Sequence, residues 1–356
     1  MPNIRVSVLQ TFAVRVLEAI GLPADAAKVT ADCLVHANLR GVDSHGVMRL
    51  VQYSQSVGRG DVNPRPSVEV LSRTGCTALV DAGGGYGFGP TLMAVELAVE
   101  LAIEHGVGVV GVRNSHHFGM AATYSERAAA AGMIGITTTN TGPVMAPIGG
   151  TKAVLGNNPI AFAIPRRSPQ PPMVFDMALS ATAFGKIRLA AAEGRSIPIG
   201  WAFNTQGRPT TDAAQALEAV LLAPMGGHKG YGLALVLDVL TGIITGSRFG
   251  SNADGHLHAE GGVGHLIIVL EPGLFVPKEQ FLDSVEALIE EVKSVPLAEG
   301  SSEIYIPGDI EYAVVARRER DGIPLSDEWF DQLVALGREL GIDTSDMHRQ
   351  SSHANV

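Results

Sequence analysis

The sequence predicts an α/β fold, and three observations support that prediction. Through the middle of the chain, short apolar runs alternate with amphipathic runs, as strands and helices alternate around a sheet. Both ends of the chain instead show mainly helical periodicity. Hydrophobic residues make up 46% of the 356 residues and charged residues only 17%, which is ample material for a large buried core. We therefore expect one large α/β domain or two intertwined domains.

The N-terminal part is expected to form three helices. The stretch VSVLQTFAVRVLEAIGL has apolar residues at helical spacing and should end at Gly21. Residues 23–39 are a second candidate helix. Asp43 or Ser44 could cap a third helix that runs to about Gly58, and GRGDVNPRP follows as a turn-rich linker.

The middle and the end of the chain alternate between predicted strands and helices. Strands are expected over residues 76–81, 107–112, 133–140, 161–165, 173–178 and 265–272. Helices are expected over residues 91–105, 121–131, 228–246 and 281–292, and again after Pro307.

The composition disfavours several classes of partner. The chain has 26 Lys and Arg against 36 Asp and Glu, a net charge of -10, and no basic stripe, so neither nucleic acid nor an anionic membrane is an expected partner. No apolar run of membrane-spanning length is free of Gly, Pro or charge, and the N-terminus lacks a signal-peptide pattern. Cys33 and Cys76 lie in apolar stretches and are expected to be buried free thiols, which predicts a cytoplasmic location.

A literal G-x-G-x-x-G match occurs at Gly106, Gly108 and Gly111. A dinucleotide-binding fingerprint must follow a strand and open a helix, whereas here a helix precedes the glycines and they lie within a strand. Gly106 is better interpreted as the residue that ends the preceding helix. If the protein binds NAD, it does so without the Rossmann turn.

Two neighbouring histidines, His116 and His117, occupy a polar break in the stretch VRNSHHFGMA. They could be two solvated loop residues, or one of them could exchange a proton in an active site, since the pKa of histidine lies near neutral pH. Adjacent histidines point in different directions, so a shared metal is not expected. The stretch HLH at residues 256–258 has no third ligand at a recognisable spacing, and we predict no metal site.

Two further stretches carry charge near a predicted helix start. In DSHGVMRL, His45 and Arg49 are four residues apart and should share a helix face, where the guanidinium could bind a carboxylate. In GGHKGYG, Lys229 at a helix N-terminus could attract a pyrophosphate. The alternative for each is a solvated first turn. The loops at residues 140–150 and 156–165 are rich in small and amide residues and could cradle a phosphate or a ribose, or be ordinary turns.

Taken together, these stretches resemble one family. SHGVMRL, NSHHFG, the Asn-Thr-Gly-Pro loop, GNNPIAFAIP, VFDMA and GGHKGYG occur in this order over almost the whole chain. The pattern strongly resembles the malate/L-lactate dehydrogenase family, whose fold differs from that of Rossmann dehydrogenases. That family also includes sulfolactate, ureidoglycolate and 2,3-diketogulonate enzymes, and reductases of piperideine- or pyrroline-2-carboxylate. The combination is specific for the family and only weakly specific for the substrate.

The resemblance implies a fold and an assembly. It implies a central mixed-sheet α/β domain that binds NAD or NADP in a non-Rossmann manner, with a helical domain formed by both chain ends. It also implies a homodimer whose active site lies near the subunit interface. The expected division is a helical part over 1–73, the α/β domain over 74–300, a return to the helical domain over 301–346 and a disordered tail over 347–356.

The resemblance also implies roles for particular residues. The catalytic set is His117, His45 and Ser44, and His117 would protonate the substrate oxygen as hydride reaches the carbon. Arg49 would bind the substrate carboxylate, together with His45 and Asn157. The implied cofactor-binding residues are His117, Phe118, Gly119, Thr141, Asp176, Met177, Ala178, His228, Lys229, Gly308 and Asp309.

Departures from the family pattern bear on the substrate. The imino-acid reductases carry Asp where this chain has Lys186, which favours a 2-hydroxy acid, whereas the doubled histidine also occurs among the imino-acid reductases. Many members have Thr where this chain has Asn157. We predict an NAD(P)-dependent dehydrogenase of a small 2-hydroxy acid, of malate/lactate type. The alternatives are a cyclic imino-acid reductase, a ureidoglycolate or sulfolactate dehydrogenase, and a non-catalytic nucleotide-binding sensor.

Overall fold

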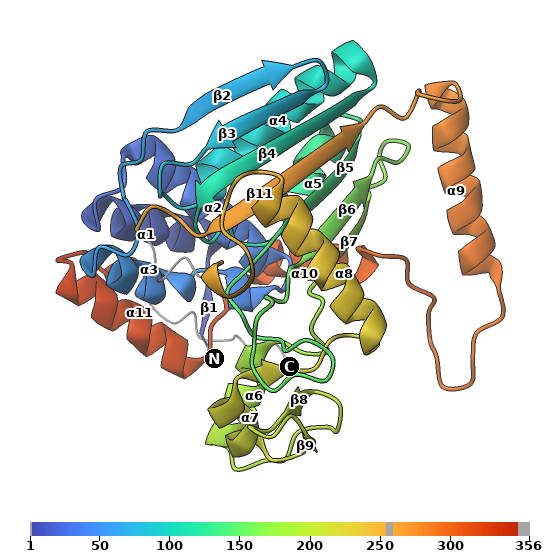
Figure 1. The fold of residues 1–356 in the computed structure, drawn as a ribbon. Helices are drawn as coiled ribbons and strands as arrows, with labels where there is room; N and C mark the ends of the chain where they lie inside the picture. Colours follow the sequence, from blue (N-terminus) through green and yellow to red (C-terminus); the bar gives the residue numbers. More distant parts are fainter. Residues whose placement is uncertain (1, 254–258, 348–356) are drawn as a thin grey trace, which may run out of the picture.

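The computed structural model describes residues 2–253 and 259–347, and its centre is a seven-stranded sheet (Figure 1). The strand order is β2–β3–β4–β11–β5–β6–β7. In this order the strands are Glu69–Thr74, Thr77–Asp81, Val107–Ser115, Val263–Leu270, Ile134–Thr139, Ile160–Ile164 and Met173–Met177. β3 and β4 pair in parallel and the other neighbours pair antiparallel, so the sheet is mixed and the predicted α/β fold is confirmed.

Helices cover both faces of this sheet. α4 (Phe88–His105) and α5 (Ala122–Ala130) pack on one face, and α8 (His228–Asp238) crosses the other (Figure 1). Because both faces are covered, β4 and β11 at the centre are apolar along most of their length rather than alternating. In the described residues, 2–253 and 259–347, no helix is both long and apolar enough to cross a membrane.

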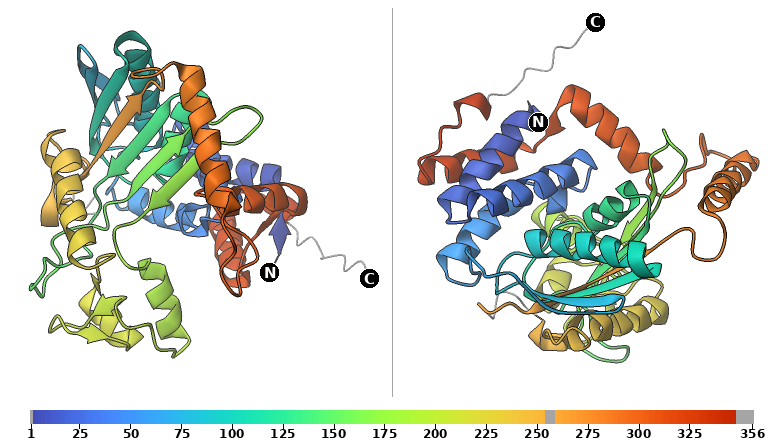
Figure 2. Two further views of the ribbon diagram at one scale, coloured as in Figure 1. Left: turned by 90° about the vertical axis from the view of Figure 1, so that its right-hand side faces the viewer. Right: turned by 90° about the horizontal axis from the view of Figure 1, so that it is seen from above.

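The two ends of the chain form one helical layer. Its helices are α1 (Val6–Ala19), α2 (Ala24–Leu39), α3 (Arg49–Gly58), α10 (Asp309–Asp321) and α11 (Asp327–Glu339). Seen from above, the layer lies outside α4 and α5 (Figure 2). A short antiparallel pair joins the two ends, β1 (Asn3–Ile4) with β12 (Ile323–Pro324). Apolar side chains from both ends then share a single core.

A small lobe sits apart from the main sheet (Figure 1). It contains α6 (Phe184–Ala192), α7 (Ala213–Ala219) and a three-stranded sheet of two-residue strands, β8 (Ala202–Phe203), β9 (Pro209–Thr210) and β10 (Leu221–Leu222). The Asp212 side chain caps α7 by accepting from the backbone N–H groups of Ala214 and Gln215. No element of this lobe was predicted from the sequence.

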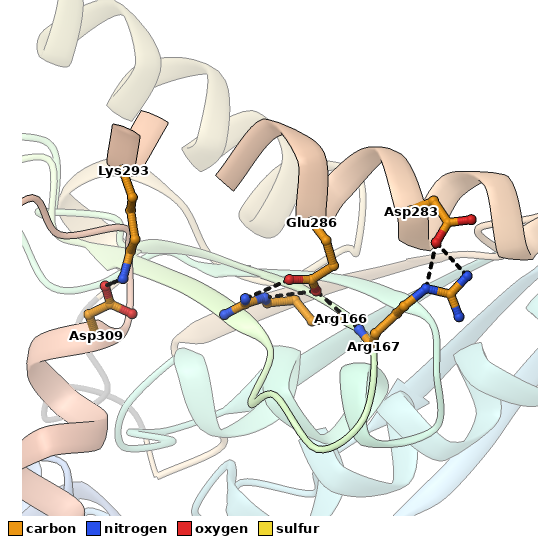
Figure 3. Close-up of polar contacts among 6 residues, drawn as sticks. All are labelled: Arg166, Arg167, Asp283, Glu286, Lys293 and Asp309. Carbon is orange, nitrogen blue, oxygen red and sulfur yellow. Dashed lines mark hydrogen bonds and ion pairs between the residues drawn. The ribbon is translucent and has the colours of Figure 1, made fainter. Parts of the chain in front are cut away.

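α9 (Lys278–Ser294) projects to one side of the molecule (Figure 1). Ile289 is the one buried residue of this helix, all of which the structure describes. Ion pairs attach α9 to the body: Arg166 with Glu286, Arg167 with Asp283, and Lys293 with Asp309 (Figure 3).

The structure corrects the predicted start of the third helix. Neither Asp43 nor Ser44 caps a helix, because a 3₁₀ turn covers Asp43–His45 and α3 begins only at Arg49. The reason is tertiary. The Asp43 carboxylate accepts from both terminal nitrogens of Arg318, at 2.6 and 3.0 Å, and so serves the contact between the chain ends.

Other predictions also need correction. The helix expected over 228–246 is α-helical only as far as Asp238, and a π-helical turn follows over Val239–Ile243. Cys33 is buried, but Cys76 is only partly buried because it lies in the turn between β2 and β3. Strand β2 was not predicted. It begins at Glu69, so the sheet starts before residue 74, where the α/β domain was expected to begin.

The C-terminal prediction is only partly open to comparison. Met347, expected in the tail, is buried against the helical layer. Residues 348–356 of the expected tail and the HLH stretch at 256–258 lie outside the described residues.

Candidate active site

The two neighbouring histidines face different surroundings in the loop between β4 and α5. His116 is buried, whereas His117 is half-buried. Phe118 is buried directly after it, and Gly119 follows with a φ of 83°, a conformation that favours glycine. Of the two imidazoles, His117 is therefore the one that a small molecule can reach.

Tyr53 of α3 contacts His117. Its hydroxyl oxygen lies 2.6 Å from Nδ1 of His117, and Tyr53 itself is almost completely buried. Burial raises the pKa of Tyr53, so the phenol stays protonated. Sequence analysis missed Tyr53, although one signal was present: it lies four residues after Arg49 and so shares a helix face with it.

His45 stacks on His117, with ring centroids 5.5 Å apart and an interplanar angle of 15°. Ser44 Oγ lies 3.0 Å from Nδ1 of His45, so the three residues expected to be catalytic come together. Burial, with a smaller contribution from the charge of Arg49, lowers the pKa of His45 to about 3. His45 is thus neutral at pH 7 and offers a hydrogen bond rather than a charge.

Arg49 is the first residue of α3, and it interacts electrostatically with both His45 and Tyr53. Its Nε donates to the Ser44 carbonyl at 2.7 Å, and its Nη1 donates to Gln52 Oε1 at 2.7 Å. No carboxylate pairs with Arg49 among residues 2–253 and 259–347. Its positive charge is therefore not neutralised by the described part of the chain, as expected of a residue that receives an anion.

Asn157 and Thr141 hydrogen-bond to each other across the long connection between β5 and β6. Thr141 Oγ1 donates to Asn157 Oδ1 at 2.9 Å and accepts from the Asn157 backbone N–H at 3.1 Å. The buried Asn158 accepts from the Thr141 backbone N–H at 3.0 Å and donates to the Ala234 carbonyl of α8 at 2.9 Å. These amide groups fix the loops, a role that sequence analysis did not assign to Asn158.

Asp176, Met177 and Ala178 lie at the end of β7, close to the loop of His117. The backbone N–H of Ala122, at the start of α5, donates to Asp176 Oδ2 at 2.8 Å. The side chain of Asp176 is in contact with solvent, but protein atoms surround most of its carboxyl group. The resulting loss of hydration raises the pKa of Asp176 to about 6. Two of the expected cofactor-binding segments are thus adjacent.

Gly308 and Asp309 lie beside the same strand. The backbone N–H of Val174 in β7 donates to the Pro307 carbonyl at 3.1 Å. A Cβ at Gly308 would come within 3.2 Å of the Val174 nitrogen, and its φ is 101°. The Asp309 carboxylate is already engaged, since Lys293 of α9 donates to it at 2.6 Å (Figure 3).

His228 and Lys229 are the first two residues of α8, and both are exposed. The backbone N–H of Met225 donates to the Leu179 carbonyl at 2.8 Å, which places the start of α8 beside the chain leaving β7. In the part of the chain that the structure describes, no hydrogen bond or ion pair joins either residue to the histidine pair.

The glycines of the literal G-x-G-x-x-G match serve packing. Gly106 ends α4 with a φ of 81°, as predicted. A Cβ at Gly108 would lie 2.0 Å from the carbonyl oxygen of Ala98, and one at Gly111 would lie 3.0 Å from Thr245. Gly108 is required because α4 approaches the strand closely, and Gly111 packs against the side chain of Thr245, so the motif does not form a nucleotide turn.

His265 of β11 is a second residue that sequence analysis missed. Its Nδ1 lies 2.7 Å from Thr139 Oγ1, its Nε2 lies 2.8 Å from Ser115 Oγ, and its ring stacks on Phe118 at 4.5 Å. Burial, with a smaller contribution from a neighbouring histidine, lowers the pKa of His265 to about 3. This neutral imidazole joins β4, β5 and β11 directly beneath the loop that carries His117. Its single position in an apolar strand gave no signal of this role.

Over residues 2–253 and 259–347, no group of three or more His, Cys, Asp or Glu side chains could hold an ion. What these described residues bring together is an imidazole, a guanidinium and a set of loops.

Comparisons with known proteins identify relatives of this chain. The sequence model of the family described as malate/L-lactate dehydrogenase matches residues 4–334. L-sulfolactate dehydrogenase of Methanocaldococcus jannaschii is 41% identical over 333 residues, which cover 93% of this chain and 95% of that protein. Malate dehydrogenase of Pyrococcus horikoshii is 36% identical over 342 residues, 94% of each chain.

Solved structures show the same fold. The M. jannaschii sulfolactate dehydrogenase structure has a TM-score of 0.88 at 39% identity and covers 96% of this chain and 98% of its own. The Δ1-piperideine-2-carboxylate reductase of Pseudomonas syringae has a TM-score of 0.85 at 29% identity, over 94% of this chain and 100% of its own. On the strength of its motifs, its fold and these matches, the chain belongs to the malate/L-lactate dehydrogenase family.

Proposed function

We propose that this protein is an NAD(P)-dependent oxidoreductase that interconverts a 2-hydroxy acid and a 2-oxo acid. The observation that carries the proposal is the meeting of a reachable imidazole, His117, with an unneutralised guanidinium, Arg49. Proton exchange at an oxygen and binding of a carboxylate are the two tasks that such a substrate sets. Relatives named as malate and sulfolactate dehydrogenases support the same reading.

The described residues are suited to a dinucleotide. Gly226 and Gly227 precede α8 with positive φ, and no atom lies within 4 Å of where a Cβ of either residue would be. The turn therefore leaves room at an exposed Lys229. A helix N-terminus with a lysine suits a pyrophosphate. Asp176, in β7, and Gly308, beside that strand, are the candidates for the other half of the cofactor. When bound, the nicotinamide would supply or accept the hydride.

In the direction of reduction, Arg49 holds the substrate carboxylate and His117 donates a proton to the carbonyl oxygen. Hydride at the carbon and a proton at the oxygen turn the C=O group into CH–OH. Since Tyr53 lies at Nδ1 of His117, we assign the exchanged proton to Nε2. After donation, Nδ1–H can donate to the neutral phenol, which keeps the Nε2 lone pair ready for the reverse reaction. The uncharged ring of His45 stacks on His117 and can hydrogen-bond to the substrate.

Nicotinamide absorbance tests this proposal directly. NADH and NADPH are each offered with oxaloacetate, pyruvate, sulfopyruvate and piperideine-2-carboxylate. We expect oxidation of one cofactor with an open-chain 2-oxo acid, which also decides between NAD and NADP. Turnover of the cyclic imine alone would instead favour an imino-acid reductase, and cofactor binding without turnover would favour a sensor.

A substitution at His117 makes the assignment sharper. His117→Asn should lower kcat by about 10²-fold or more while cofactor still binds, because it removes the proton donor. His105→Asn, at the end of α4, is the matched control and should leave kcat unchanged. A fully active His117→Asn enzyme would sink the proposed mechanism.

We also propose that the protein is a homodimer that works in the cytoplasm. The family resemblance implies the dimer, and a row of exposed apolar side chains along α8 and the following π turn supports it. This row consists of Leu235, Val236, Val239, Ile243 and Ile244. Contiguous exposed apolar surface of this kind is typical of an interface. The two free cysteines suit a reducing compartment.

A further inference from the structure

The guanidinium of Arg188, on the small lobe, has no role in the mechanism proposed above. Two backbone hydrogen bonds hold the segment between β7 and α6. The backbone N–H of Leu179 donates to the Asn157 carbonyl at 2.7 Å, and that of Ala181 donates to the Ala223 carbonyl at 2.7 Å. The start of α6 is therefore attached to the loop of Asn157, one of the expected substrate-binding residues.

Arg188 projects from the exposed side of α6. Ile187 and Ala190 are buried in the core of the small lobe, which leaves Arg188 on the opposite side of the helix. Its guanidinium carbon lies 5.1 Å from the centre of the Phe184 ring, so the side chain is supported within its own helix. Among residues 2–253 and 259–347, no carboxylate pairs with it.

Arg188 lies within electrostatic range of Arg49. Burial lowers the pKa of Arg49, and the positive charge of Arg188 contributes to the same lowering. Arg166 and Arg318, by contrast, each pair with a carboxylate, that of Glu286 and that of Asp43. In a chain with a net charge of -10, two unneutralised guanidiniums that repel one another mark a place for more than one negative charge.

We propose that Arg188 is a specificity-determining residue that binds a second anionic group of the substrate. This inference rests on the proposed function and narrows it. With Arg49 on the C1 carboxylate, Arg188 selects a 2-oxo acid that carries a carboxylate or a sulfonate at its other end over an uncharged one such as pyruvate.

Arg188→Met tests this assignment, because methionine keeps an apolar stem for Phe184 but removes the charge. Loss of a charged hydrogen bond worth about 1.5–3 kcal/mol corresponds to about 10- to 150-fold. We therefore expect kcat/KM for oxaloacetate or sulfopyruvate to fall by about that factor, mainly through KM. The value for pyruvate should stay within about twofold. Comparing oxaloacetate with sulfopyruvate in the wild-type protein tells which anionic group the site prefers.

Arg195→Met is the matched control. Arg195 also belongs to the small lobe, but it pairs with Glu193 and is exposed, so its loss should change neither constant. An equal fall for oxaloacetate and pyruvate would overturn the proposal. A rise in the KM of the cofactor alone would also overturn it, because Arg188 would then serve a cofactor phosphate.

A binding measurement separates this inference from the proposed function. In the presence of NAD or NADP, L-malate should raise the melting temperature of the wild-type protein more than L-lactate does. Arg188→Met should remove that difference. Equal shifts by the two ligands in the wild-type protein would overturn the role of Arg188 even if oxo acids are turned over. A difference that depends on Arg188 would support it even if no substrate in the panel is reduced.

Discussion

The hydroxyl of Tyr53 determines which nitrogen of His117 is available for chemistry. Because its pKa is raised by burial, the phenol remains a neutral partner for Nδ1 across the working pH range. A neutral partner fixes the ring without binding the proton that the reaction needs. Tyr53 is thus a positioning residue, one whose effect is exerted through the imidazole.

Tyr53→Phe should therefore lower kcat by about 10-fold while leaving the KM of the cofactor unchanged, because the imidazole loses the hydrogen bond that holds the orientation of its ring. The pH profile of kcat, measured alongside, should shift because the surroundings of the imidazole change. Tyr305→Phe, at an exposed position, is the control. If kcat and its pH profile match the wild type, Tyr53 only fills space.

Asp176 predicts a pH dependence of stability. Its pKa is raised to about 6 in the folded protein from an ordinary value of 3.8, so the folded state binds the proton more tightly than the unfolded state. The stability of the wild-type protein should accordingly fall as the pH rises from about 4 to about 6, and this cost persists above that window. The carboxyl is exposed to solvent, so the cost is discounted to on the order of 1 kcal/mol.

Asp176→Asn should then raise the melting temperature more at pH 8 than at pH 4.5, because the amide avoids the poorly hydrated charge and can still accept from Ala122. Scanning calorimetry at the two pH values provides the comparison. A stabilisation that is equal at both values would show that the carboxyl titrates normally.

At the scale of elements, the close approach of α4 to β4 depends on Gly108. Gly108→Ala would place a Cβ 2.0 Å from a helix carbonyl and should destabilise the protein by about 3 kcal/mol, since neither backbone can yield easily. Gly89→Ala, within α4 and with open space around it, should stabilise it by about 0.5–1 kcal/mol. Urea unfolding of both variants measures the contrast. Equal and small effects would show that the helix can shift away from the strand.

Elements with a strong period were predictable, and the others were not. The apolar strands and the long amphipathic helices follow from the local pattern. β2 is exposed along its whole length and so shows no alternation, and the two-residue strands of the small lobe are too short to show any. The start of α3 was mispredicted because Asp43 is bound by Arg318, a residue that is distant in the sequence.

The residues of the site also fall into a predictable group and an unpredictable group. Its loops carry motifs, and the resemblance named His117, His45 and Arg49, which the structure brings together. Tyr53 and Arg188 carry no motif, because their positions depend on how α3 and α6 fold over the loops. Residues that belong to one short motif can be predicted from the sequence. Contacts between residues of different elements require the three-dimensional structure.

For the whole molecule, the apolar row on α8 leads to a test of assembly. Sedimentation equilibrium should give a dimer for the wild-type protein at micromolar concentration. Ile244→Glu combined with Val236→Glu should shift it to a monomer, because two charges would be buried in the interface. Ile103→Glu, which changes an equally exposed residue on α4, should remain dimeric. A monomeric wild-type protein, or dissociation of all variants alike, would refute the proposed interface.

The short pairing of β1 with β12 has a consequence for biosynthesis. A ribosome makes residues 3–4 long before residues 323–324, yet each segment needs the other as its strand partner. α1 and α2 therefore emerge early with apolar faces that their C-terminal partners in the shared core cannot yet cover. The sheet can assemble before β12 and α11 are made, but the helical layer is completed only after them. The segment that holds Arg49 and Tyr53 is thus made early and completed late, so enzymatic activity should appear only after α11 has been synthesised.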